Sequence, residues 1–229
     1  KGSATLHYRP PRRAGQRLQK RCSGHGSLDR GMSASYHNWD REAAVQRALQ
    51  HADRSGASSE DGRFVYNFAF GSNLNADKVK SRSMRPVQTL RGVLTGWRLL
   101  FNHNGGYGNI ETDDLCASMS YDLSRLNKPP NEVHGVLLKF SRQEFAQLAW
   151  EEYAYDTVEV PVAVYAADRK GTGAIQPALA FKTNSCALVS TTTMPSLRYI
   201  ALIAEGARAA GIDAPYCEWL DRVRNACRA

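Results

Sequence analysis

The sequence predicts an α+β domain in which strands come first, helices come last and the sheet is able to curl into a small barrel. Two apolar runs, at Phe64–Phe70 and Val133–Phe140, have the length and composition of strands. The strict alternation of valines from Val158 to Val164 indicates a third strand. Helical spacing of apolar residues dominates the C-terminal end, and no internal repeat is evident. This order of elements is typical of the α+β class.

Residues 1–63 are predicted to form a basic arm and linker outside the domain. They hold 12 Lys and Arg against 6 Asp and Glu, whereas residues 64–229 hold 18 against 16. The net charge of +8 is therefore concentrated in the arm. We expect residues 1–37 to be extended, Asp40–His51 to form a short helix and Ser55–Gly62 to be a polar linker. The domain itself is predicted to span residues 64–229.

The composition of the arm allows several interpretations. Residues 1–30 are rich in Arg, contain Ser and hold a single acid, Asp29, which is typical of an organelle transit peptide or of what remains behind one. The simplest interpretation is a solvated basic tail. The alternative is an arm that binds a large assembly, nucleic acid or an anionic membrane surface. Direct nucleic-acid binding is the weaker of these, because aromatic residues are not interleaved with the basic ones as stacking platforms.

Cysteine and histidine usage argues against a disulfide framework and against a zinc site. The cysteines are odd in number and widely scattered, and no Cys-x-x-Cys pair occurs. We therefore expect a reducing intracellular compartment, with an organelle interior (mitochondrion or plastid) preferred over the cytoplasm. His103 and His134 lack metal-ligand spacing, so no metal or cofactor is predicted. No stretch approaches the roughly 18 apolar residues of a membrane span. The five cysteines are Cys22, Cys116, Cys186, Cys217 and Cys227.

The first predicted strand stops abruptly in Gly71-Ser72-Asn73. A glycine at a strand end lets the main chain approach a ligand closely and presents backbone N–H groups to it. Asn75 is placed to cap a short helix that runs through Lys80.

The next segments are predicted as two strands joined by a glycine-rich loop. Arg91–Phe101 and Leu115–Tyr121 have strand character, and Asn102–Gly108 lies between them. This loop lacks the Gly-Lys-Ser/Thr ending of a phosphate-binding loop and does not directly open a helix. We interpret it as a substrate-side or hairpin loop, not a nucleotide site.

The strand at Val133–Phe140 is apolar enough to be buried on both faces. Directly after it, Ser141 and Glu144 have the spacing of a capping box, which predicts a helix that runs to Trp150 or just beyond. Pro161 lies inside the alternating valine strand, which indicates a sheet edge or a bulge there.

Two helices are predicted near the C-terminus. Pro195 suits the first turn of the first helix, and Gly211 is a good terminator. A second helix is expected to begin near Asp213 and to bury Trp219.

Four short motifs follow one another along the domain. They are Phe68-Ala69-Phe70-Gly71-Ser72-Asn73-Leu74, then Val133-His134-Gly135-Val136-Leu137, then Leu148-Ala149-Trp150-Glu151-Glu152, and finally Pro195-Ser196-Leu197-Arg198-Tyr199 with Gly206-Ala207, Gly211 and Tyr216. In this order they resemble the γ-glutamylcyclotransferase superfamily, over a match from Phe64 to about Val223. The first motif is the most specific, and the others gain weight from their order. The N-terminal arm lies outside the match.

The resemblance implies a small mixed β-barrel with flanking helices and a cavity at one end. It implies a reaction in which the free α-amino group of a γ-glutamyl compound attacks its own γ-carbonyl, which releases 5-oxoproline and an amine. The implied partner is therefore a small γ-glutamyl substrate, and no cofactor is implied. The substrate-binding residues would be Phe70, Gly71, Ser72, Asn73, Leu74 and Tyr155.

The motif alignment implies that Glu152 is the catalytic residue. Nucleophile and electrophile both belong to the substrate, so the enzyme mainly folds the substrate into attack geometry. One carboxyl group is then sufficient, because it acts first as general base and then as general acid. Glu151 is the alternative if the alignment is shifted by one residue. Ser72 has no Ser-His-Asp setting and is not predicted to be a nucleophile.

Three positions depart from the family pattern. Phe70 stands where the family usually has Tyr, Ala149 stands where it has Asp, and Tyr153 stands where Gly is frequent. Together with the basic arm, these departures support a second hypothesis. The chain would then be a catalytically weak or inactive accessory subunit of a large organellar assembly, with the fold used for protein–protein packing.

Overall fold

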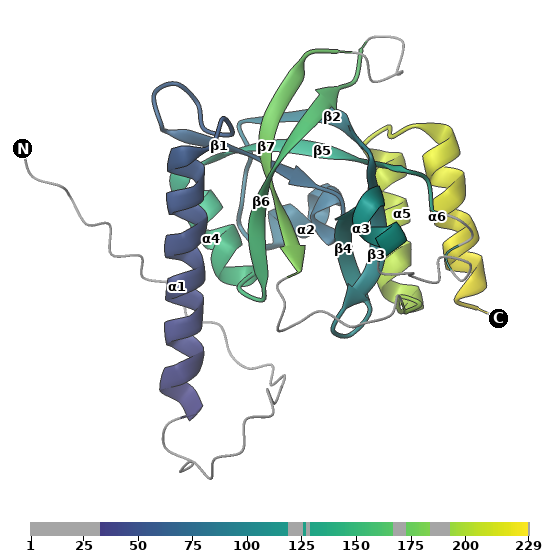
Figure 1. Ribbon diagram of the computed structural model, residues 1–229, viewed down its shortest axis with the longest axis horizontal. Helices are drawn as coiled ribbons and strands as arrows, with labels where there is room; N and C mark the ends of the chain where they lie inside the picture. Colours follow the sequence, from purple (N-terminus) through teal and green to yellow (C-terminus); the bar gives the residue numbers. More distant parts are fainter. Residues whose placement is uncertain (1–32, 119–125, 127–128, 167–172, 184–192, 229) are drawn as a thin grey trace, which may run out of the picture.

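The computed structural model describes residues 33–118, 126, 129–166, 173–183 and 193–228 (Figure 1). The strands are β1 (Phe64–Ala69), β2 (Gln88–Thr95), β3 (Trp97–His103), β4 (Tyr107–Thr112), β5 (Glu132–Ser141), β6 (Tyr155–Val164) and β7 (Ile175–Thr183). The helices are α1 (Ser33–Arg54), α2 (Ala76–Ser81), α3 (Asp113–Ser118), α4 (Arg142–Glu151), α5 (Leu197–Ala209) and α6 (Ala214–Ala226), with a 3₁₀ turn, η1, at Ser72–Leu74. None of the helices in this part of the chain is both long and apolar enough to cross a bilayer.

Five strands form a closed barrel in the order β1-β5-β2-β6-β7. Neighbouring strands are antiparallel except β1 and β7, which run parallel and close the barrel through the pair Asn67 and Leu179. The buried Asn67 side chain reinforces this closure, because its Nδ2 donates to the Leu179 carbonyl at 2.8 Å. The predicted α+β fold with a small mixed barrel is confirmed.

The flanking elements cover the barrel on two sides (Figure 1). Helix α1 runs along α4 and β6, while α5 and α6 pack together on the other side. The β3–β4 hairpin is a separate two-stranded sheet that contacts β5 and β7. The core is continuous from the barrel into the C-terminal helices, where Trp219 is buried and its indole N–H donates to the Leu126 carbonyl at 2.8 Å.

Local capping chemistry sets the helix starts that the sequence predicts. The Asn75 side chain accepts hydrogen bonds from the backbone N–H groups of Asp77 and Lys78 and caps α2. At α4 the capping box is complete: the Ser141 hydroxyl accepts from the Glu144 N–H at 3.2 Å, and the Glu144 carboxylate accepts from the Ser141 N–H at 3.1 Å. Each cap satisfies backbone donors that have no partner inside the helix.

The position of Pro161 also follows the prediction. It pairs with Pro177 in the β6–β7 ladder, whereas β2 pairs with β6 only at Ala163 and Val164. Pro161 therefore lies where β6 has a single partner strand, which is where a residue without a backbone N–H is tolerated.

Two predictions in the middle of the chain are wrong. The single strand expected at Arg91–Phe101 is two strands, β2 and β3, because Gly96 between them has a left-handed φ of +79° and turns the chain. The strand expected at Leu115–Tyr121 is helical as far as Ser118, and the remainder lies outside the described residues. Two acids, Asp113 and Asp114, occupy the first turn of α3, where the helix dipole favours them.

Two further corrections concern helix ends. The short helix expected at Asp40–His51 begins at Ser33 and continues to Arg54, so residues 33–37 are helical and not extended. Pro195 precedes α5 instead of opening it, because Ser196 is the N-cap and its hydroxyl accepts from the Tyr199 N–H. Gly211 ends this helical segment with a φ of +69°, as expected for a terminating glycine.

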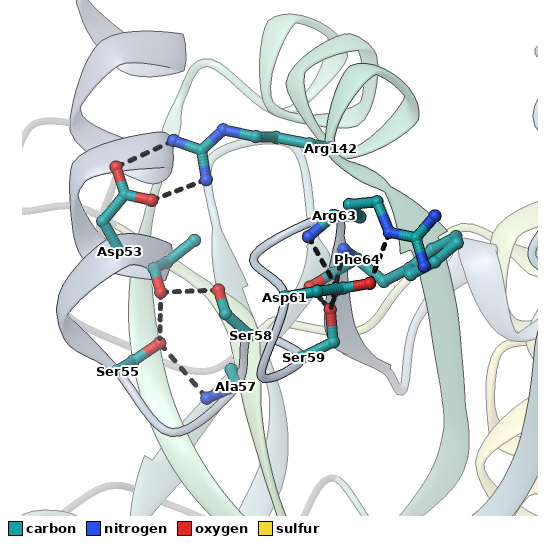
Figure 2. A network of polar contacts seen from close by, with 10 residues as sticks. Asp53, Ser55, Ala57, Ser58, Ser59, Asp61, Arg63, Phe64 and Arg142 are labelled. Atoms are coloured by element: carbon teal, nitrogen blue, oxygen red, sulfur yellow. Dashed lines mark hydrogen bonds and ion pairs between the residues drawn. The ribbon is translucent and has the colours of Figure 1, made fainter. Parts of the chain in front are cut away.

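The predicted polar linker after α1 is a compact hydrogen-bonded turn (Figure 2). The Ser59 hydroxyl donates to the Asp61 carboxylate at 2.7 Å and accepts from the Phe64 N–H at 3.0 Å. The predicted arm up to residue 32 lies outside the described residues. The division into an arm (1–63) and a domain (64–229) therefore stays a prediction, although α1 itself rests on the barrel.

Candidate active site

The predicted site residues meet at one end of the barrel. Strand register places the beginning of β6 beside the end of β7, because Tyr155 pairs with Thr183. Since β1 runs parallel to β7, the end of β1 and the turn after it lie at the same end. Motifs far apart in the sequence are thereby brought to one edge of the sheet.

The turn after β1 is a tight 3₁₀ turn in which the Leu74 N–H donates to the Gly71 carbonyl at 3.0 Å. A Cβ atom on Gly71 would lie 3.1 Å from the Tyr199 hydroxyl, which is a tight contact, so the absence of a side chain here lets Tyr199 approach the turn closely. Phe70 and Leu74 are buried in the hydrophobic core. These two residues anchor the two ends of the turn in the core, and their side chains are shielded from solvent.

Glu152 lies beside this turn. It is the C-cap of α4, and its carboxylate Oε1 accepts a hydrogen bond from the Asn73 side-chain amide at 3.1 Å, across 79 positions of sequence. Its side chain is 15% exposed, so most of its surface is shielded from solvent. Glu151, the alternative in the alignment, is exposed on the helix. Of the two adjacent acids, Glu152 therefore contacts the turn, whereas Glu151 faces solvent.

Arg82 completes a triangle with these two residues and was not anticipated from the sequence. Its Nη1 donates to the Glu152 carboxylate at 2.8 Å and to the Asn73 Oδ1 at 2.9 Å. The Arg82 side chain is also only 15% exposed. Arg82 therefore holds the Glu152 carboxylate in position beside the turn.

Aromatic side chains form a wall next to this triangle. The Tyr155 hydroxyl donates to the Gly108 carbonyl at 3.3 Å, and its ring stacks on His103 with centroids 4.1 Å apart. The Tyr199 hydroxyl accepts from the Gly108 N–H at 3.1 Å, and Tyr107 packs edge-on against the Tyr199 ring at 5.1 Å. The loop predicted at Asn102–Gly108 is thus the tip of the β3–β4 hairpin, and it contributes Gly108 to the site.

Burial keeps the two tyrosines of this wall in their neutral form. Desolvation raises the pKa of Tyr155 and the pKa of Tyr199 far above the ordinary value, and the nearby Glu152 carboxylate adds to both shifts. The Tyr199 hydroxyl is also within hydrogen-bonding reach of the Ser72 N–H. A hydroxyl that accepts from backbone donors has its own proton available for a ligand. Tyr199 is therefore a candidate hydrogen-bond donor to a ligand. It belongs to the fourth sequence motif, but the motif alone does not indicate this role.

Two basic residues, Lys78 and Arg82, lie near the two acids. Burial is the largest cause that lowers the pKa of Lys78, with repulsion from Arg82 acting in the same direction and attraction from Glu151 and Glu152 opposing it. Arg198 also repels Lys78. The site therefore combines one shielded carboxylate with several cations, an arrangement suited to an anionic ligand.

The three residues that depart from the family pattern differ in their burial and contacts. Ala149 is buried in the core on α4. Tyr153 is partly exposed, and its ring lies under the guanidinium of Arg41 from α1. Phe70 is buried and packs near Phe68, with ring centroids 6.3 Å apart.

Comparison with solved structures identifies the architecture. No protein-family profile and no curated protein matches the sequence. A structure described as a γ-glutamyl cyclotransferase superposes with a TM-score of 0.52 at 21% identity, covering 69% of this chain and 86% of that one. The chain has the γ-glutamylcyclotransferase-like fold.

Two further structures support the γ-glutamylcyclotransferase-like fold. An uncharacterized human protein superposes with a TM-score of 0.53 at 19% identity, over 73% of this chain and 99% of that one. A yeast γ-glutamyl cyclotransferase specific to glutathione gives a TM-score of 0.53 at 13% identity, over 72% and 96%. At these identities the similarity establishes the fold, and function has to be argued from the site itself.

Proposed function

We propose that this protein is a γ-glutamylcyclotransferase-type enzyme, which releases 5-oxoproline from γ-glutamyl amino acids or amines with Glu152 as the single acid/base. The observation that carries this proposal is the position of the Glu152 carboxylate, 3.1 Å from the Asn73 amide of the Gly71-Ser72-Asn73 turn. The shared fold with solved γ-glutamyl cyclotransferases agrees with it.

The proposed chemistry needs one proton acceptor and a hydrogen-bond donor to the γ-carbonyl oxygen of the substrate. The ionised Glu152 takes a proton from the substrate α-amino group as its nitrogen bonds to the γ-carbonyl carbon. The carbonyl oxygen then carries negative charge, which the Tyr199 hydroxyl and a backbone N–H of the turn would stabilise. Glu152 returns the proton to the leaving nitrogen as the original C–N bond breaks. The products are 5-oxoproline and a free amine, and the enzyme ends in its starting state.

A matched pair of variants tests the proposal. The purified protein is incubated with a panel of γ-glutamyl dipeptides and γ-glutamyl amines, and 5-oxoproline is quantified by mass spectrometry. We expect product from the wild type, a loss of about 10²–10⁴-fold in kcat for Glu152→Gln, and wild-type turnover for the exposed neighbour Glu151→Gln. A folded wild type that forms no product from any substrate, or a fully active Glu152→Gln, would overturn the proposal.

The second hypothesis, an accessory subunit of a mitochondrial or plastid assembly, stays a prediction. It depends on the basic arm, most of which lies in residues 1–32, outside the described part of the chain. Removing residues 1–32 and following co-sedimentation with large particles in organelle extracts tests it. The same applies to direct nucleic-acid contact through the arm, for which salt-dependent RNA binding by the full chain is the measurement.

A further inference from the structure

We propose that helix α1 is a positioning element for the site, and that Arg41 is a positioning residue for Glu152. The Glu152 turn, residues 151–155, connects α4 to β6, and α1 holds both of these elements from one side (Figure 1). The kinetic consequence of this inference rests on the proposed function, whereas its structural consequence does not.

The first attachment lies at the start of α4, far from Glu152. Asp53, near the end of α1, accepts two hydrogen bonds from the Arg142 guanidinium, at 2.6 and 2.7 Å (Figure 2). These bonds lower the pKa of Asp53 below its ordinary value. A bidentate pair of this kind fixes orientation as well as distance. It therefore sets the position of α1 along α4.

The second attachment lies at the end of α4, on both sides of Glu152. The Arg41 guanidinium carbon is 4.3 Å from the Tyr153 ring centroid and 5.6 Å from that of Trp150. Its Nη1 also approaches the Trp150 carbonyl at 3.5 Å. A cation is favoured here, because the last carbonyls of a helix lack intrahelical partners and carry the negative end of its dipole. Arg41 thus contacts the residues that flank the acid.

The third attachment joins α1 to β6. The His51 Nδ1 is 2.8 Å from the Thr157 hydroxyl, and the Arg47 Nε is 3.8 Å from the Asp156 carboxylate. Both partners lie in the first residues of β6, directly after the Glu152 turn. One helix therefore contacts the element that leads into the turn and the element that leads out of it.

The length of α1 explains how this one helix can contact both ends of α4. The residues from Arg41 to Asp53 span about 18 Å along α1, and the ten residues of α4 span about 15 Å. Helix α1 therefore reaches both ends of α4. The two helices pack closely, since Ala44 and Ala48 of α1 and Ala149 of α4 are small and buried.

The Glu152 turn is held on the side of the site by Arg82 and Asn73, and α1 holds it on the other side. Apart from helix and strand bonds, its backbone is joined by the Glu152 N–H to the Leu148 carbonyl at 2.9 Å and by the Tyr155 N–H to the Glu152 carbonyl at 2.8 Å. Helix ends open more easily than the middle of a sheet. Because a misplacement of about 1 Å can cost up to about 10²-fold in rate, contacts that hold this turn act on catalysis without touching the substrate.

Variants of Arg41 test the inference in the full-length protein. Arg41→Ala removes both the charge and the planar stacking group, Arg41→Lys restores the charge alone, and Gln46→Ala changes an exposed residue of the same helix. We measure kcat and KM for 5-oxoproline formation, together with amide hydrogen exchange of Glu152 and Tyr155. We expect Arg41→Ala to lower kcat about 10- to 100-fold with KM little changed, and to accelerate exchange at these two amides. Exchange in β1 and β5 should stay as in the wild type.

The conservative variants sharpen the test. Arg41→Lys should recover part of both effects, Gln46→Ala should show neither, and Asp53→Asn, at the remote attachment, should change both in the same direction but less. Unchanged exchange at Glu152 and Tyr155 in Arg41→Ala overturns the inference, as does faster exchange spread evenly over the barrel. A wild type without activity refutes the proposed function, while the exchange data still decide whether α1 holds the turn. Faster local exchange with an unchanged kcat overturns the catalytic consequence.

Discussion

Arg82 is the residue on which the candidate site depends most directly for its shape. Its guanidinium bonds to Glu152 and Asn73, so the acid and the turn are joined through a third side chain as well as to each other. Its backbone carbonyl accepts from the Gln147 side-chain amide at 2.6 Å, which ties the end of α2 to α4. One residue thereby links the three segments that meet at the site.

Replacing Arg82 with Ala should lower the free energy of unfolding by about 1.5–3 kcal/mol, the range for hydrogen bonds to a charged group. The loss arises because the shielded Glu152 carboxylate loses its ionic partner. Urea unfolding followed by circular dichroism measures it. Arg85→Ala, which removes an exposed arginine three positions later, is the control and should stay within about 0.5 kcal/mol of the wild type. Equal stability of Arg82→Ala and Arg85→Ala would contradict this account of the triangle.

The residues of the candidate site differ in how visible they are in the sequence. Gly71, Asn73 and Glu152 belong to linear motifs, so their types and order point to them directly. Arg82 follows a short helix, where a basic residue is common, and only folding brings it to Glu152 across 70 positions. The role of Tyr199 depends on α5 approaching the turn. No local pattern encodes such a contact.

At the scale of elements, the approach of α5 to the turn depends on a glycine. A Cβ atom on Gly206 would lie 2.8 Å from the backbone N and Cα of Asn75, a contact that real Cβ atoms do not make. This contact lies next to the site along the chain, since Asn75 directly follows η1. The placement of α5, and with it the Tyr199 hydroxyl, follows from the absence of a side chain at position 206.

Gly206→Ala should therefore destabilise the protein by about 1–3 kcal/mol through overpacking. This sign is informative, because in an exposed helix the same change stabilises by about 1 kcal/mol. Thermal or urea unfolding gives the magnitude. Glu205→Ala, at the preceding exposed position of α5, is the matched control and should be close to neutral. A stabilised Gly206→Ala would show that α5 does not lie this close to Asn75.

Elements defined by local chemistry are the ones that the sequence predicts well. The cap at Asn75 and the capping box at Ser141 depend on residues within one turn, so their spacing is sufficient. The break at Gly96 was missed because apolar residues continue on both sides of it. Strand β7 was not predicted either, because its place depends on pairing with β6 and on parallel closure against β1. The mixed barrel is predicted by the resemblance to the γ-glutamylcyclotransferase superfamily, because local patterns alone do not determine how the strands pair.

At the scale of the whole molecule, burial of tyrosines in and around the barrel predicts a loss of stability at alkaline pH. Burial is the main cause that raises the pKa of Tyr165 to about 12, and it raises the pKa of Tyr155, Tyr199 and Tyr216 as well. In the unfolded chain a tyrosine ionises near pH 10. Their contribution is therefore complete below pH 10 and is lost as the pH rises from there toward the folded-state values.

Tyr216→Phe isolates one of these groups, because Tyr216 is buried between α6 and the barrel and the change keeps its ring. We expect the free energy of unfolding of the wild type, from urea titrations at pH 8, 10 and 11, to fall steeply above pH 10. The decline in Tyr216→Phe should be shallower by up to about 1.4 kcal/mol per pH unit, the slope for one proton. Absorbance at 295 nm should show this phenol ionising only as the protein unfolds. Parallel declines in the two proteins would mean that Tyr216 titrates in the folded state as it does in the unfolded chain, and the burial argument for the barrel tyrosines would fail with it.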